Sequence, residues 1–339
     1  MATITRDSAP SRPDFLLILA RFREVSIILF ILLLVLLVSL RAPTFLTPGN
    51  IRIILMNISI LAIVSLAQAM VIITRGIDLS VSSMVGLTAM IVAFTVRAYP
   101  FTPIPILIVL GMGLGLVLGS FNGVLIAAGR VPPIIATLGT LSVYRGLIFL
   151  YSQGTWINAH EMPEAFKRLT KAAPLGLPNL VIFAAVAAVL VYYFLNYTRP
   201  GRDIYALGSN PDAAKMSGIR TQRITFLVYA LSGLACGLAG VLWASRFEAA
   251  QTNTATGFEL QTVAASVVGG VNMLGGSGTV PGVLLGALLL GIIENSLTLV
   301  RISPFWQLAA QGLLILLAVV ADSSIQRRLR QVGRRGGLI

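Results

Sequence analysis

Long apolar runs alternate with short polar segments over most of the 339 residues of this chain. A helix needs about 20 predominantly apolar residues to cross the hydrocarbon core of a bilayer, and most of the runs have about that length. The strands of a membrane barrel would instead appear as short segments of alternating polarity. The pattern predicts an all-α, polytopic helical membrane protein with about ten transmembrane spans.

The first apolar run follows a polar, arginine-bearing segment at residues 1–24. No small-x-small cleavage site follows it, so we interpret the run as an uncleaved first helix that starts in the cytoplasm. Glycines at 269 and 270 make the eighth run the least regular. The predicted spans are 25–40, 51–74, 79–96, 104–128, 132–152, 180–197, 224–245, 258–273, 280–300 and 305–321.

Composition and charge agree with a membrane domain over residues 25–321. The chain is 56% hydrophobic and 11% charged, whereas soluble domains carry roughly 25% charged residues. Its net charge of +13 comes from basic residues that flank apolar runs, which favours membrane orientation over nucleic-acid binding.

The distribution of basic residues predicts the orientation. With an even number of spans, both ends of the chain, the loop at 198–223 and the tail at 322–339 face the cytoplasm. That placement puts 16 of the 25 Lys and Arg residues inside: four before the first span, Arg75, Arg130, five in the central loop and five in the tail. The excess agrees with the positive-inside rule.

The loop at 198–223 is the longest polar, charge-bearing segment between strongly apolar runs. Asn210 is a good helix N-cap and Pro211 suits the first turn, because the proline lacks an N–H that would be unpaired there. Gly218 supplies a left-handed stop. The segment predicts a short helix from Pro211 to about Ser217, in which Ala213 and Ala214 leave a small face for another protein. An ordinary connecting loop is the alternative.

Acidic and amide side chains inside the apolar runs are candidates for a translocation path, because ionised groups at membrane depth tend to face a partner or a wet cavity. The alternative is structural. Asp78 could cap backbone N–H groups before the third span, Glu294 could pair with Asn295 or a neighbouring helix, and amides also bond helix to helix. The candidates are Asn57, Gln68, Asp78, Asn122, Glu259, Asn272 and Glu294.

Small residues recur at helical spacing, and a short motif recurs once. Glycine ladders stand at 111, 115 and 119, at 233 and 237, and at 282 and 286. We interpret them as close helix packing rather than transport chemistry. The tetrapeptides GIDL at 76–79 and GFEL at 257–260 follow the second and seventh spans. Two halves of five spans each would be inverted, a common plan in transporters.

No catalytic arrangement, cofactor site or metal site is apparent in the sequence. Cys236 is the single cysteine and His160 the single histidine. There is no G-x-S-x-G, no H-E-x-x-H and no Gly-Lys pair for a phosphate-binding loop. If ATP drives this protein, a different polypeptide must hydrolyse it.

Four separated motifs, in order, resemble the permease subunits of ribose-type ABC sugar importers over about residues 45–320. They are TRGIDLSV at 74–81, PPIIATLGT at 132–140, ALGSNPDAA at 206–214 with SGI at 217–219, and VGG at 268–270 with GGSGT at 275–279. Two departures are local: Arg75 stands where the family usually has a second glycine, and Ser82 where glycine is common.

The resemblance implies a permease in a bacterial inner membrane, paired with a second permease copy or homologue. Two cytoplasmic ATP-binding subunits and a periplasmic sugar-binding protein would serve it. It also implies that the central loop docks on the ATPase and transmits its closure to the gate. The residues that match this coupling loop are Gly208, Asn210, Pro211, Ala213, Ala214, Ser217, Gly218 and Ile219.

Sparse intramembrane charge agrees with a neutral sugar as cargo. WINAHEM at 156–162 and ISPFWQ at 302–307 resemble most the rhamnose branch and, more distantly, the autoinducer-2 branch. Ribose or another pentose is the alternative cargo. Two other classes remain as rivals: a secondary transporter coupled to an ion through a buried acid such as Glu294, and a membrane enzyme, which would need a reactive constellation that the sequence lacks.

Overall fold

The computed structural model describes residues 23–174 and 176–303, together with five single positions between 306 and 316. The predicted N-terminal segment, apart from its last two residues, the basic tail and most of the predicted tenth span therefore lie outside the described residues. Within the described part every regular element is a helix, and the only bridge between extended residues joins Ile157 and Ala250. The all-α prediction is confirmed.

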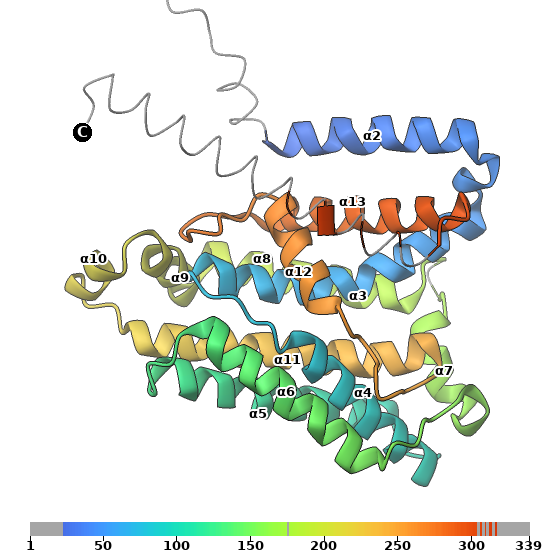
Figure 1. Cartoon of the computed structure of the whole chain (residues 1–339), viewed down its shortest axis with the longest axis horizontal. Coiled ribbons are helices and arrows are strands. Elements are labelled where there is room, and N and C mark those ends of the chain that lie inside the picture. The colour runs from blue at the N-terminus through green and yellow to red at the C-terminus, as the bar shows by residue number, and fades with distance from the viewer. Residues whose placement is uncertain are drawn as a thin grey trace, which may run out of the picture.

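Eight of the described helices are long and apolar enough to cross a membrane. Their ends lie within three residues of the predicted spans. They are α2 (Arg23–Arg41), α3 (Pro48–Ile73), α4 (Val81–Ala98), α5 (Ile104–Ala127), α6 (Pro133–Ser152), α8 (Asn179–Tyr197), α11 (Thr221–Phe247) and α13 (Val280–Leu299). Figure 1 shows most of them side by side along one direction.

The predicted eighth span is wrong in length. In its place the structure has α12, Phe258–Val268, with 11 residues. At 1.5 Å per residue such a helix is about 16 Å long, roughly half of a bilayer core. It ends at Gly269, and Gly270 then takes a φ of 101°, which only glycine adopts readily. α12 is therefore a half-span, and it runs across the direction of the long helices (Figure 1).

Two long helices are each followed by a non-helical segment that turns back into the bundle. α3 leads into residues 74–80 and then α4, and α11 leads into residues 248–257 and then α12. α3 and α11 run in opposite directions in Figure 1. Arg75 and Glu248, close to the two helix ends, both have a positive φ, 68° and 52°. The two GIDL-like tetrapeptides fall at these breaks, which is the arrangement that an inverted repeat predicts.

The glycine ladders of α5 and α11 lie against each other. A Cβ atom added at Gly115 would meet the backbone of Gly233 and Gly237, and one at Gly119 would meet the backbone of Tyr229 and Gly233. Gly282 and Gly286 lie in the same way on the backbone of α12. Apolar burial gives helices no driving force to associate in lipid, so van der Waals contact between closely spaced backbones holds them together. The packing interpretation of these glycines is confirmed.

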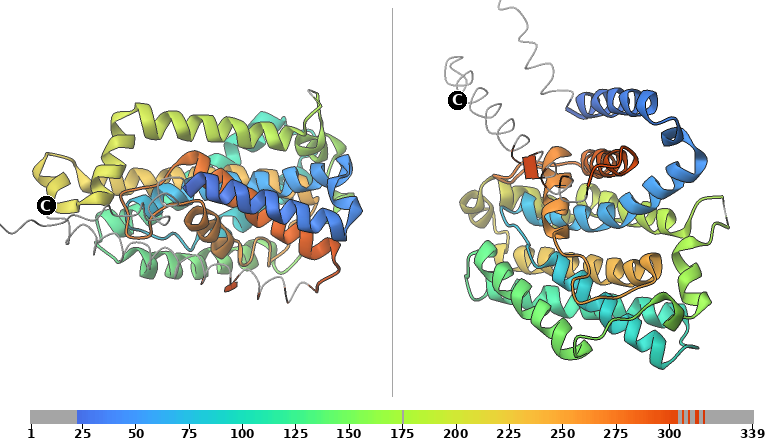
Figure 2. Two further views of the ribbon diagram at one scale, coloured as in Figure 1. Left: turned by 90° about the horizontal axis from the view of Figure 1, so that it is seen from above. Right: turned by 45° about the vertical axis from the view of Figure 1, so that its right-hand side comes forward.

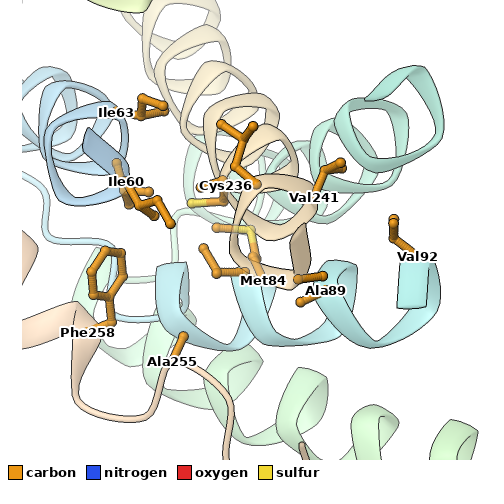
Figure 3. Close-up of a cluster of buried hydrophobic side chains, with 14 of the residues drawn as sticks. Ile60, Ile63, Met84, Ala89, Val92, Cys236, Val241, Ala255 and Phe258 are labelled. Atoms are coloured by element: carbon orange, nitrogen blue, oxygen red, sulfur yellow. The ribbon is translucent and has the colours of Figure 1, made fainter. Parts of the chain in front are cut away.

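The largest apolar core lies where α3, α4 and α11 meet. Cys236 is fully buried there among side chains that include Ile60 and Met84, as Figure 3 shows. The 248–257 segment and α12 contribute Ala255 and Phe258 to the same cluster. Burial in an apolar core accounts for the position of this cysteine.

The central segment holds two helices rather than one. Besides α10 (Pro211–Met216), the structure has α9 (Arg199–Ser209), where the sequence predicts only loop. The Thr198 hydroxyl caps α9 by accepting from the N–H of Gly201 at 3.2 Å. Ile204 and Leu207 bury one face of α9 against the bundle. The two views of Figure 2 place α9 and α10 at one end of the molecule, beyond the long helices.

The opposite end carries α7 (Glu164–Lys171) and the 3-10 helices η1 (Pro43–Leu46) and η2 (Ala159–Glu161). Basic residues here pair with acids: Arg97 with Glu161 at 3.2 Å, and Lys171 with Glu248. The backbone N–H of Asn158 and the Arg97 guanidinium hold the pKa of Glu161 below its ordinary value. This pairing offsets part of the positive charge at the end predicted to face outward.

Candidate functional site

The short helix α10 forms as its caps predict. The Asn210 side-chain oxygen accepts from the backbone N–H groups of Asp212 and Ala213, both at 3.1 Å. Pro211 occupies the first turn. Gly218 has a φ of 82°, and the N–H of Ile219 returns to the Ala214 carbonyl at 3.0 Å. Ser217 is the C-cap.

The face that α10 presents differs from the prediction in one residue. Ala213 is exposed, as are Asp212, Lys215 and Met216. Ala214 is only 4% exposed and lies on the buried face of α10. The prediction that both alanines form the outer face is wrong for Ala214, because consecutive positions on a helix point about 100° apart. The compact outer face is therefore made by Ala213.

A hollow of about 850 Å³ adjoins α10 at the same end of the molecule. Its rim carries Arg130 and Lys215, together with Arg220 and Arg223 at the start of α11. Four positive charges beside an exposed helix suit an acidic protein surface, because complementary charge steers and orients a partner.

Three of the predicted path residues meet inside the bundle. Asp78, Gln68 and Asn122 are each fully buried. The Gln68 amide lies within 3.2 Å of both the N–H and the carbonyl of Asp78, and it satisfies both when its oxygen faces the N–H. Asp78 stands on the non-helical 74–80 segment, so a side chain from α3 replaces the backbone partners that a helix would have supplied.

Serines supply the hydrogen bonds to the Asp78 carboxylate. Oδ1 accepts from the N–H of Ser80 at 3.0 Å and from its hydroxyl at 2.6 Å. Oδ2 accepts from the Ser232 hydroxyl on α11 at 3.2 Å. The Asn122 amide on α5 donates to the Ser80 hydroxyl at 2.8 Å. The network joins the 74–80 segment to α3, α5 and α11. The bond from the Ser80 N–H to Asp78 is the backbone capping that the sequence offered as the structural alternative for Asp78.

Asn57 and Glu294 lie in a different place. Both line a cavity of about 320 Å³ between α3, α11, α12 and α13. Gln261 and the aromatic residues Trp243 and Phe258 line the same cavity. Ligand pockets commonly combine apolar and aromatic walls with a few polar groups. The volume of this cavity lies at the lower end of the range that is usual for such pockets.

Glu294 does not pair with Asn295. The Asn295 amide instead exchanges two hydrogen bonds with Asn50 of α3, at 2.9 and 3.0 Å. Asn295 therefore joins α13 to α3, and Glu294 is left facing the cavity. The predicted pairing of Glu294 with Asn295 is therefore wrong, and the alternative of a partner on a neighbouring helix stays a prediction.

Glu259 and Asn272 are separate from both groups. Glu259 is half-buried in the first turn of α12 and faces the charge of Arg145 on α6. Arg145 donates to the carbonyls of Thr252 and Thr254, at 3.2 and 2.8 Å, and so holds the 248–257 segment. Asn272 closes the loop before α13 by accepting from the N–H of Leu274 at 2.9 Å. The seven path candidates thus divide into three groups: three lie in the network around Asp78, two line the cavity, and Glu259 and Asn272 lie apart from both.

Sequence reasoning missed Ser80, Ser232 and Arg145. Hydroxyls are unremarkable in membrane helices, so the two serines carry no local signal. Arg145 was detectable, since an arginine inside a predicted span is costly unless it has partners. For metals, the described residues bring no three His, Cys, Asp or Glu side chains together.

Comparisons with known proteins place the chain among transport permeases. The family described as branched-chain amino acid transport system / permease component matches residues 50–319. The ribose import permease protein RbsC of Escherichia coli K12 is 37% identical over 309 residues, which cover 89% of this chain and 94% of that protein. RbsC of Bacillus subtilis is 38% identical over 290 residues, 86% of this chain and 89% of that protein.

A relative with another cargo in its name is about as similar. The autoinducer 2 import system permease protein LsrC of Salmonella typhi is 36% identical over 313 residues, 91% of this chain and 89% of that protein. No solved structure matches the chain. With a family match over most of its length and eight described helices that can span a bilayer, the chain belongs to the branched-chain amino acid transport system / permease component family of membrane proteins.

Proposed function

We propose that this chain is the membrane permease of an ATP-driven importer for a neutral sugar, in a bacterial inner membrane. The observation that carries the proposal is similarity over about nine tenths of the chain to ribose and autoinducer-2 import permeases. The chain contains no phosphate-binding loop, so the ATP-binding subunits are separate polypeptides. A periplasmic binding protein delivers the sugar, and a second permease copy, identical or homologous, completes the path.

In this proposal α10 is the contact to the ATP-binding subunit. It is exposed, capped at both ends and flanked by a basic hollow. This end of the molecule and both chain termini face the cytoplasm, in agreement with the excess of basic residues predicted to lie inside. Closure of the ATP-binding subunits would push on α10 and alternate the access of the path.

The relatives named above point to ribose or autoinducer-2 rather than to rhamnose, toward which the short sequence stretches lean. We therefore propose a pentose or a related small neutral sugar as cargo. The cavity beside Asn57 and Trp243 supports this choice, because its amides and the carboxyl group of Glu294 can hydrogen-bond to sugar hydroxyls while its aromatic walls contact the ring.

The test is transport by purified components. The permease is reconstituted in liposomes with candidate ATP-binding and sugar-binding proteins, and uptake of labelled ribose, rhamnose and autoinducer-2 is measured with and without ATP. We expect uptake of one sugar that requires both ATP and the binding protein. Accumulation by the permease alone under a proton or sodium gradient would overturn the importer proposal and favour an ion-coupled carrier.

A further inference from the structure

Three segments that are distant in the sequence meet just inside α9 and α10. They are the end of α3 at residues 73–75, the end of α9 at 208–209 and the loop at 269–279 that precedes α13. The N–H of Gly276 donates to the Ile73 carbonyl at 2.9 Å. The Tyr205 hydroxyl of α9 donates to the Gly278 carbonyl at 2.9 Å. A Cβ atom at Gly208 would collide with the Ile73 carbonyl, so the backbones are in direct contact.

Arg75 joins two of these segments through its side chain. Its Nε donates to the Gly208 carbonyl at 2.6 Å and its Nη2 to the Ser209 carbonyl at 2.7 Å. These carbonyls end α9, where helical partners run out and a positive charge is favourable. The planar guanidinium donates to the two acceptors from two separate nitrogens in a fixed geometry, which the single nitrogen of a lysine does not reproduce.

The backbone of Arg75 is held in a conformation that favours glycine. Its φ is 68°, in the left-handed region, which is unfavourable for residues other than glycine. Such an outlier persists only when its surroundings hold it in place, and here the two hydrogen bonds to α9 do so.

Arg75 connects α10 to the buried network around Asp78. Ser209 is followed at once by Asn210, which caps α10. On the other side, Arg75 is the second residue of the 74–80 segment, and three residues later Asp78 enters the buried network with Ser80 and Ser232. Any displacement of α9 and α10 therefore reaches the 74–80 segment through the Arg75 side chain, in addition to the backbone contact between Gly208 and Ile73.

We propose that Arg75 is a positioning residue that transmits movement of α10 to the buried network around Asp78. The proposal rests on the proposed function, in that α10 is the element that the ATP-binding subunits move. Gly276 reinforces the link by tying the loop before α13 to the same helix end, so α12 and α13 follow the movement as well.

The test compares Arg75→Gly with Arg301→Gly. Arg301 is a matched control, because it is an exposed arginine with a φ of 60° outside the basic hollow, and no hydrogen bond of its side chain is found among the described residues. Glycine relieves the backbone strain at either site, so neither variant should impair folding. We expect sugar transported per ATP hydrolysed to fall at least tenfold in Arg75→Gly and to stay within twofold in Arg301→Gly. Arg75→Lys should fall between them.

A second measurement is independent of transport. Hydrogen exchange of the purified permease alone should show at least tenfold faster exchange at residues 204–210 and 76–80 in Arg75→Gly, with no change in Arg301→Gly. Unchanged exchange would show that Arg75 links nothing, and wild-type transport per ATP in Arg75→Gly would overturn its role in coupling. Absence of ATP-dependent uptake in the wild type would instead count against the importer itself, while the exchange comparison still decides the link.

Discussion

At the scale of single residues, Asp78 is the clearest case of a buried group with defined partners. Its two oxygens accept three hydrogen bonds from Ser80 and Ser232, and its backbone is paired by Gln68. A carboxylate used in this way holds the 74–80 segment in place, and a neutral cargo has no need of its charge. Shape and hydrogen bonding, rather than charge, should therefore decide which substitutions are tolerated.

Asp78→Asn keeps an acceptor for Ser80 and can donate to the Ser232 hydroxyl, so the thermal unfolding midpoint of the purified permease should change little. Asp78→Ala leaves buried donors without partners, each at a cost of roughly 1–3 kcal/mol. Its midpoint should fall by several degrees, measured in the same detergent. Equal midpoints for Asp78→Ala and the wild type would contradict the role of the network.

Substitutions at the two alanines of α10 distinguish an effect on folding from an effect on partner contact. Ala213 is exposed, so Ala213→Leu should leave the permease stable while it weakens coupling of ATP hydrolysis to uptake. Ala214 is buried, so Ala214→Leu should overpack the segment and destabilise it, typically by about 1–3 kcal/mol.

The readouts are the unfolding midpoint of the permease and sugar uptake per ATP. Gly218→Pro should also uncouple, because proline cannot adopt the φ of 82° that ends α10. Normal uptake per ATP in Ala213→Leu and Gly218→Pro together would remove α10 as the coupling element.

At the scale of elements, α5 and α11 pack closely against each other through facing glycine ladders. The backbones of Gly115 and Gly233 touch, so neither position has room for a methyl group. α11 also carries Ser232, one residue before this contact. The glycine interface therefore sets how closely α11 approaches the Asp78 network.

Gly115→Ala and Gly113→Ala test this interface within one helix. At Gly113 an added Cβ meets nothing within 4 Å, whereas at Gly115 it overlaps the backbone of α11. Forced separation of well-packed elements costs typically about 1–3 kcal/mol. We expect a lower unfolding midpoint and poorer membrane yield for Gly115→Ala only. A similar loss in Gly113→Ala would mean that glycine matters to α5 for another reason.

At the scale of the whole molecule, the two ends of the bundle differ in chemistry. One end holds α9, α10 and the basic hollow, and the other holds the ion pairs Arg97 with Glu161 and Lys171 with Glu248. The proposed orientation places the first end in the cytoplasm. The single cysteine, Cys236, is fully buried, so thiol labelling can test that orientation cleanly.

In a Cys236→Ser background, Lys215→Cys on α10 and Phe101→Cys in the loop after α4 mark the two ends. Phe101 is 97% exposed, and Lys215 is exposed as well. A membrane-impermeant maleimide should label Phe101→Cys in intact spheroplasts and Lys215→Cys only after permeabilisation. Wild-type protein, with its buried thiol, serves as the unlabelled control. The opposite pattern would invert the proposed topology.

The sequence by itself determined the features that depend on neighbours in the chain. Apolar runs of helical length gave the spans, and Asn210, Pro211 and Gly218 gave α10 with its ends, because caps act within a few residues of their own position. α9 was missed although Thr198 caps it, since its amphipathic face has meaning only against the bundle that buries Ile204 and Leu207.

Only the tertiary structure decided which polar residues act together. Asp78 meets Ser232 across 154 positions, and Arg75 meets Gly208 across 133. Nothing local in the sequence encodes such contacts. The same holds for α12, where a glycine-interrupted apolar run could be a whole span or half of one. The packing of α12 against α3 and α13, and the left-handed turn at Gly270, settle its length, because helix ends in a bundle are fixed by the neighbours that satisfy their backbone groups.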